Sequence, residues 1–92
     1  MYLFLDNTAE ELIIYVSVEG ESIREYRKSV RGEGSILKAL EKVLSAEGRK
    51  PAGLSGLAVR VGVGRFTATR MAAVFANVMA YSLGIPVCAV HD

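Results

Sequence analysis

The chain has 92 residues, which is the size of one domain, and its 11 Lys and Arg residues nearly balance its 10 Asp and Glu residues. This balance excludes a strongly basic nucleic-acid binder and a self-repelling acidic tail. Apolar residues make up 51% of the chain, too many for a disordered protein, and a single cysteine excludes a disulfide framework. No apolar run reaches the ~18 residues of a membrane span, and no charged segment leads into an apolar stretch at the start. We therefore expect a small soluble intracellular domain.

The first third of the chain has the pattern of three antiparallel strands. Residues 1–6 form an apolar run that ends at an acid, which predicts a buried strand presenting Asp6 at its carboxyl end. Residues 11–18 are rich in β-branched and aromatic types and indicate a second strand. Residues 22–30 alternate but carry charges on both faces, as expected of a third strand near an edge of the sheet.

The apolar period then changes to that of a helix. A stripe of apolar residues predicts a helix that begins at Ser35 and ends at Gly48. We expect a fourth strand within residues 54–61, a glycine-rich turn at 62–64, a long helix over 66–83 and a last strand at 86–90. The order β-β-β-α-β-α-β predicts an α/β fold, in which a mixed five-stranded sheet carries two main helices.

The long helix is unusual because it carries no charged residue from Met71 to Leu83. An ordinary surface helix keeps one wide charged face. Two interpretations of its apolar surface remain open. The first helix of the same chain can cover it, or it can form a subunit interface. We favour the interface, because a short chain leaves few residues to cover both sides of this helix.

The expected interface combines apolar residues of both helices, including alanines spaced by four that would let a second helix approach closely. Its members are Ile36, Leu40, Val43, Met71, Ala72, Phe75, Ala76, Met79 and Ala80. A glutamate in place of Ala76 separates the two interpretations. It should abolish assembly if this face is an interface and unfold the domain if this face is internal.

Two stretches resemble the signatures of the TsaB (YeaZ) family. Residues 61–70, Val-Gly-Val-Gly-Arg-Phe-Thr-Ala-Thr-Arg, resemble that family's Gly-Pro-Gly-Ser-Phe-Thr-Gly-x-Arg at the start of a helix rich in small residues. Residues 3–9, Leu-Phe-Leu-Asp-Asn-Thr-Ala, resemble its opening Leu-Asp-Thr-Ala strand and loop. Three positions depart from the family pattern, namely Val63, Arg65 and Ala68. The resemblance gives structural motif roles to Asp6, Thr8, Gly62, Gly64, Phe66, Thr67 and Arg70.

The resemblance covers essentially the whole chain but only the N-terminal half of the usual family member. It implies one TsaB-like domain over residues 1–92, an RNase H-like half-domain of the actin, Hsp70 and sugar-kinase superfamily, with the C-terminal half-domain absent. It also implies a noncatalytic scaffold that pairs through its helices with TsaD, the enzyme that transfers a threonylcarbamoyl group to an adenosine of tRNA. Homodimers would use the same surface. Such a protein would be cytoplasmic, would need no cofactor or metal, and would associate with tRNA indirectly.

Two other functions remain open. The chain could be a small nucleotide-binding module that uses residues 62–70, or a self-associating structural dimer without an enzyme partner. Catalysis by the chain alone is not expected, because the glycine turn lacks the Lys-Ser/Thr of a P-loop and residues 48–91 contain no carboxylate for a two-metal site. We interpret four more residues as structural: Asp6 as a turn cap, Thr67 as a helix cap, Cys88 as a buried hydrophobe and His91 as a frayed end.

Arg70 differs from these residues because it stands in the first turn of the long helix, where a positive charge is disfavoured. We expect an acid to offset this charge, either Asp6 or an acid on a partner.

Overall fold

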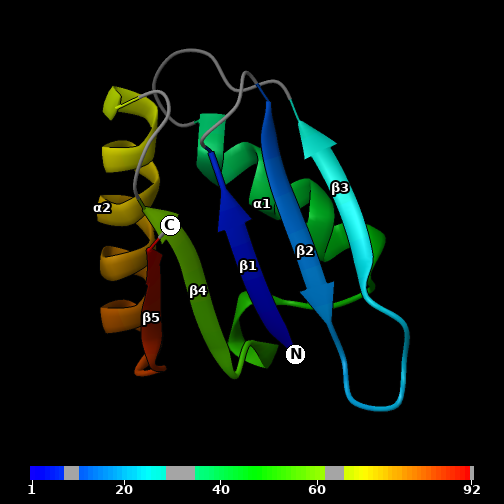
Figure 1. The fold of residues 1–92 in the computed structure, drawn as a ribbon. Helices are drawn as coiled ribbons and strands as arrows, with labels where there is room; N and C mark the ends of the chain where they lie inside the picture. The colour runs from blue at the N-terminus through cyan, green and yellow to red at the C-terminus, as the bar shows by residue number, and fades with distance from the viewer. Residues whose placement is uncertain (8–10, 29–34, 62–65, 92) are drawn as a thin grey trace.

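A computed structural model describes residues 1–7, 11–28, 35–61 and 66–91 of the chain (Figure 1). The roles expected of Thr8, Gly62 and Gly64 lie outside these residues, as do the side chains of Phe66, Thr67 and Met71. The elements are β1 (Tyr2–Asp6), β2 (Leu12–Ser17), β3 (Arg24–Lys28), α1 (Ser35–Ala46), a 3-10 turn (Pro51–Gly53), β4 (Gly56–Val61), α2 (Phe66–Leu83) and β5 (Val87–His91). The predicted order of strands and helices is confirmed.

The five strands form one mixed sheet in the order β3-β2-β1-β4-β5. The first three strands pair antiparallel, whereas β4 is parallel to both β1 and β5. Leu5 of β1 lies opposite Ile14 of β2 on one side and Val59 of β4 on the other. The charged strand β3 lies at one edge, as its alternating charges predicted, and β5 lies at the other. The predicted fold class, a mixed five-stranded sheet with two main helices, is confirmed.

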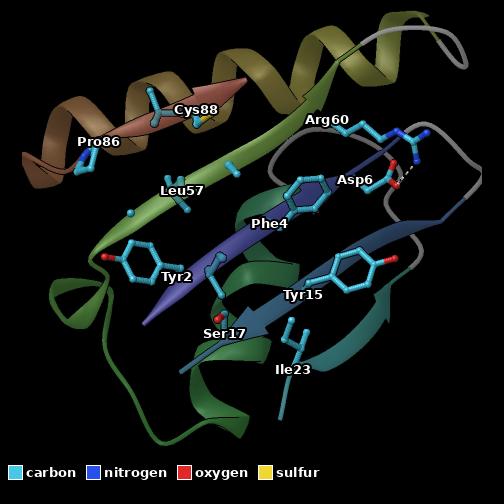
Figure 2. Close-up of a pocket in the computed structure, with 14 residues that line it drawn as sticks. Tyr2, Phe4, Asp6, Tyr15, Ser17, Ile23, Leu57, Arg60, Pro86 and Cys88 are labelled. Atoms are coloured by element: carbon cyan, nitrogen blue, oxygen red, sulfur yellow. Dashed lines mark hydrogen bonds and ion pairs between the residues drawn. The ribbon is translucent and has the colours of Figure 1, made fainter. Parts of the chain in front are cut away.

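Both helices lie on the same face of the sheet, so the core is a single layer between the sheet and the helices (Figures 1 and 2). Alternation along the strands explains which side chains enter it, because successive residues of a strand point to opposite faces. Leu3 and Leu5 of β1 point into this layer, while Tyr2 and Phe4 point to the other face. The core also contains Leu12, Ile14, Val16, Leu57 and Val59 from the sheet, Ile36, Ala39, Leu40, Val43 and Leu44 from α1, and Ala72, Ala76 and Ala80 from α2.

A small polar cluster ties the edge strand β3 to the end of α1. Glu47 directly follows α1, and its carboxylate accepts hydrogen bonds from Nε of Arg24 at 2.7 Å and from the hydroxyl of Tyr26 at 2.6 Å. A second guanidinium nitrogen of Arg24 donates to the other carboxylate oxygen. These bonds favour the ionised acid and lower the pKa of Glu47 to about 2, whereas the same carboxylate raises the pKa of Tyr26.

We expect Glu47→Gln to lower the free energy of unfolding by about 1–3 kcal/mol at pH 7, because the charged hydrogen bonds to Arg24 are lost from a side chain that is 6% exposed. The folded pKa of Glu47 is depressed below the ordinary 4.5. This contribution is therefore complete above about pH 4.5 and is lost as the pH falls towards 2. Urea denaturation at pH 7 and pH 2.5 measures it.

The exposed Glu41 of α1 provides the control, since Glu41→Gln removes an equal charge from solvent. Its effect should be small at both pH values. A Glu47→Gln penalty of the same size at both pH values would show that the ionised carboxylate does not provide this stability.

Among the described residues, neither helix is both long and apolar enough to cross a membrane.

Candidate functional site

The small-residue stripe of α2 faces the sheet of its own chain. Ala72, Ala76 and Ala80 are buried, and they recur every four residues along one side of the helix. Alanine side chains are short, so they let the helix axis lie close to the sheet. This corrects the expected interface, because these three residues serve packing within the chain.

The apolar stripe of α1 is also buried within the chain. Ile36, Leu40 and Val43 are buried in the core, together with the rest of that stripe. Phe75 and Met79 of α2 are half-buried and pack against the core from its margin. The reason is geometric: one face of a five-stranded sheet is wide enough to receive two helices side by side. Each helix therefore buries its most regular apolar stripe within the chain.

The side of α2 that faces away from the sheet is exposed, and it carries no charged residue between Met71 and Leu83. Val74, Val78 and Tyr81 are 62%, 60% and 91% exposed, and their spacing of four and three places them on one helical face. We call these three residues the α2 surface. Large apolar side chains in a row on a solvent-facing helix are typical of an interaction site. The spacing of Val74, Val78 and Tyr81 in the sequence already indicates a shared helical face. The sequence-based prediction instead placed the interface on the alanine stripe.

At the carboxyl end of the parallel strands, Asp6 forms an ion pair with Arg60. Nη1 of Arg60 donates to Oδ2 of Asp6 at 3.1 Å, and the Asp6 side chain is almost fully buried (Figure 2). The pair follows from the register, because Leu5 of β1 lies opposite Val59 of β4 and each residue of the pair is the next along its strand. The sequence patterns did not indicate Arg60 as a partner of Asp6. That an acid offsets the charge of Arg70, with Asp6 as one candidate, stays a prediction. The side chain of Arg70 is exposed.

The described residues contain no group of three His, Cys, Asp or Glu side chains placed to hold a metal ion. The carboxylate of Asp6 accepts a hydrogen bond from the guanidinium of Arg60. This pairing suits a structural role at the end of the strand better than a role as a metal ligand or a base.

The structure also corrects the prediction for Cys88, which is exposed rather than buried. It lies opposite Ala58 of β4, on the edge strand β5, and both side chains line the face of the sheet that the helices leave open (Figure 2). The sequence around Cys88 is apolar enough for a buried strand, but an edge position with a helix on one face only leaves this side chain accessible.

That open face holds a shallow apolar groove of about 590 Å³. The rings of Phe4 and Tyr15 pack edge to face, with their centroids 5.7 Å apart, and both line the groove (Figure 2). The floor is low because β4 contributes the small residues Gly56 and Ala58 on this face. The ring of Tyr2 lies over Gly56, where a Cβ would come within 2.9 Å of it. Sequence analysis did not identify this groove, since its residues come from five separate segments.

Comparison with solved structures identifies the fold. The chain superposes on YeaZ from Pseudomonas aeruginosa with a TM-score of 0.85 and 25% sequence identity over 99% of its length. A second Pseudomonas aeruginosa protein, described as similar to the peptidase YeaZ, superposes with a TM-score of 0.82 and the same identity. The chain spans 42% and 43% of these two proteins, which is less than half of each. No protein-family model and no curated protein matches the sequence. The chain therefore has a YeaZ-like fold.

Proposed function

We propose that this chain is a noncatalytic, TsaB-like scaffold subunit that supports threonylcarbamoyladenosine modification of tRNA in the cytoplasm. The fold likeness to YeaZ supports the family, in keeping with the two motif stretches at residues 3–9 and 61–70. In this proposal residues 1–92 correspond to the N-terminal domain of such a protein. The chain contributes binding to a TsaD-like enzyme, and the enzyme performs the transfer.

The α2 surface is the observation that carries this proposal. Val74, Val78 and Tyr81 form an exposed apolar row in the part of α2 from Met71 to Leu83, which carries no charge. These three side chains are already exposed, so a partner can contact them while the core stays intact. Aromatic and aliphatic side chains of this kind dominate the centres of protein interfaces. We propose that this row, flanked by the half-buried Phe75 and Met79, packs against a helix of the TsaD-like partner. A second copy of the chain can occupy the same surface when the enzyme is absent.

We expect Val78→Glu to weaken binding to a TsaD homologue from the same organism by about 100-fold or more, because the substitution buries an unpaired charge at the centre of the α2 surface. The fold should not change, since Val78 is 60% exposed. Affinity capture of the enzyme followed by titration calorimetry measures the loss. In cells, the variant should lower the threonylcarbamoyladenosine content of tRNA, measured by mass spectrometry of nucleosides.

Ile23→Glu is the matched control, because Ile23 is 67% exposed and lies on the opposite face of the sheet. It should bind the enzyme as the unchanged chain does. Equal binding by the Val78 variant would contradict docking through α2. Failure of the unchanged chain to bind the enzyme, with normal tRNA modification in its absence, would contradict the proposed function itself.

A further inference from the structure

The two edge strands of the sheet differ in how well they are protected against pairing with another strand. Strand β3 carries Glu25, Arg27 and Lys28, and charged side chains on an edge strand discourage such pairing. Strand β5 forms the opposite edge, and its residues 87–90 include no charged residue and no proline (Figure 1). An unprotected apolar edge strand is open to the addition of one more strand.

Strand β5 is also poorly covered on both of its faces. Helix α2 packs mainly over β4 and less over β5. Val87 and Ala89 point to the helix side, as their alignment with Leu57 and Val59 of β4 shows, yet both are exposed. Cys88 and the residue two places after it point to the open face and are exposed as well. A run of exposed apolar residues in one strand is typical of a surface that a partner covers.

The hydrogen bonding of the sheet shows which backbone groups of β5 face outwards. The N–H of Leu57 in β4 donates to the carbonyl oxygen of Pro86, which directly precedes β5, at 3.0 Å. Successive residues of a strand direct their N–H and C=O groups to opposite sides. The even-numbered residues of β5 therefore bond to β4, and the odd-numbered residues present these groups at the free edge. Ala89, the midpoint of β5, is one of the outward-facing residues.

We propose that β5 pairs antiparallel with β5 of a second copy of this chain, about a two-fold axis at Ala89. Ala89 then exchanges backbone hydrogen bonds with Ala89 of the second copy, and Val87 exchanges them with His91 of the second copy. Between these pairs, Cys88 lies opposite Val90 of the second copy. This register pairs the whole of β5, because Ala89 is its midpoint.

A second copy fits this edge because β5 is complementary to itself. Pairing about a two-fold axis places the exposed apolar side chains of one β5 beside those of the other on both faces of the joint sheet. Pairing β5 with β3 of another copy would instead set charged side chains beside an apolar strand. In the two-fold arrangement the β3 strands become the outer edges, and their charges oppose further growth, so the assembly closes as a dimer.

This inference goes beyond the proposed function, because it concerns an edge of the sheet and not the α2 surface. Val74, Val78 and Tyr81 lie on the side of α2 opposite to the alanines that face the sheet, so the paired strands leave them accessible. The inference holds whether or not a TsaD-like enzyme is the partner.

The test is disulfide trapping between two proteins that each contain one cysteine. The unchanged chain contributes Cys88, its single and exposed cysteine, and the second protein is the double variant Cys88→Ser, Val90→Cys. Facing residues between the hydrogen-bonded pairs of an antiparallel ladder have Cα atoms about 4.5 Å apart, which a disulfide spans. After oxidation of the mixture with diamide, we expect a cross-linked dimer of one copy of each protein. It should be at least tenfold more abundant than the cross-linked dimer of either protein alone, measured by non-reducing electrophoresis and mass spectrometry.

The double variant Cys88→Ser, Ile23→Cys is the control for random collision, because Ile23 is 67% exposed and directly precedes the other edge strand. It should cross-link to the unchanged chain at least tenfold less. Ala89→Pro in both proteins of the first mixture should also reduce cross-linking at least tenfold, since proline removes an N–H at the free edge and leaves the bonds to β4 in place. Circular dichroism checks that this variant folds, and Val87→Lys replaces it if it does not.

Val78→Glu in both proteins should leave cross-linking unchanged, so failure of the α2 proposal and failure of this one are distinguishable. Loss of cross-linking in that variant would overturn the proposal, because the second copy would then sit on the α2 surface. Absence of cross-linking in the first mixture, or equal cross-linking in the mixture with the Ile23 variant, would overturn it as well.

Discussion

Replacing Ala76 with glutamate is expected to unfold the domain rather than to release a folded monomer. Ala76 is 0% exposed and lies between α2 and the sheet, so a carboxylate there has no access to water. Burying an uncompensated charge costs several kcal/mol even after the structure relaxes. A domain of this size has a total stability of about 5–15 kcal/mol, so one such substitution removes a large share of it.

Circular dichroism and gel filtration of the purified variant measure this outcome. Asn77→Glu is the matched control, because Asn77 is the next residue along the same helix and is exposed. The control should keep the helical signal and the melting temperature of the unchanged chain to within a few degrees. A folded, monomeric Ala76→Glu variant would mean that this side of α2 faces outwards, contrary to the structure.

Shortening Leu40 to alanine is expected to lower the free energy of unfolding by about 3–5 kcal/mol. Leu40 is fully buried in the centre of α1, where it packs with strand residues such as Leu5 and Val16 in one core. The substitution removes three buried carbon atoms and leaves a cavity that a rigid sheet cannot close. Urea denaturation followed by circular dichroism measures the difference.

Leu37→Ala, on the same helix, is the control for helix propensity and for the loss of a leucine. Leu37 is 43% exposed, so its truncation should cost less than about 1 kcal/mol. The earlier expectation that Leu40 belongs to a subunit interface makes a different prediction. In that case Leu40→Ala would weaken association and leave the stability of the isolated chain nearly unchanged.

Local patterns were sufficient for the secondary structure. The alternation in residues 22–30 predicted an edge strand, and β3 is at the edge of the sheet. The apolar stripe between Ser35 and Gly48 predicted α1 to within a few residues. Periodicity works here because the side chains of a strand or an amphipathic helix are sorted by burial at fixed intervals.

Contacts between residues of different strands and helices could not be predicted from local sequence patterns. The Asp6–Arg60 pair joins residues 54 positions apart, and only the parallel register of β1 and β4 brings them together. Cys88 belongs to an apolar strand, and such a strand is buried when it lies in the middle of a sheet. Here the strand lies at an edge, and the side chain of Cys88 is exposed. The open groove depends on both helices packing on one face, which no local pattern specifies.

The amino-acid sequence by itself determined the order of the strands and helices, the class of the fold and the lack of charge in α2 from Met71 to Leu83, because these depend on the type and spacing of neighbouring residues. Only the tertiary structure decided which side of α2 is free. From Met71 to Leu83 the helix has two sides without charge. The spacing of residues assigns side chains to one side or the other, but it does not tell which side packs against the sheet. The small alanines permit the closer approach and therefore the denser packing. The alanines therefore face the sheet, and Val74, Val78 and Tyr81 remain exposed on the other side of the helix.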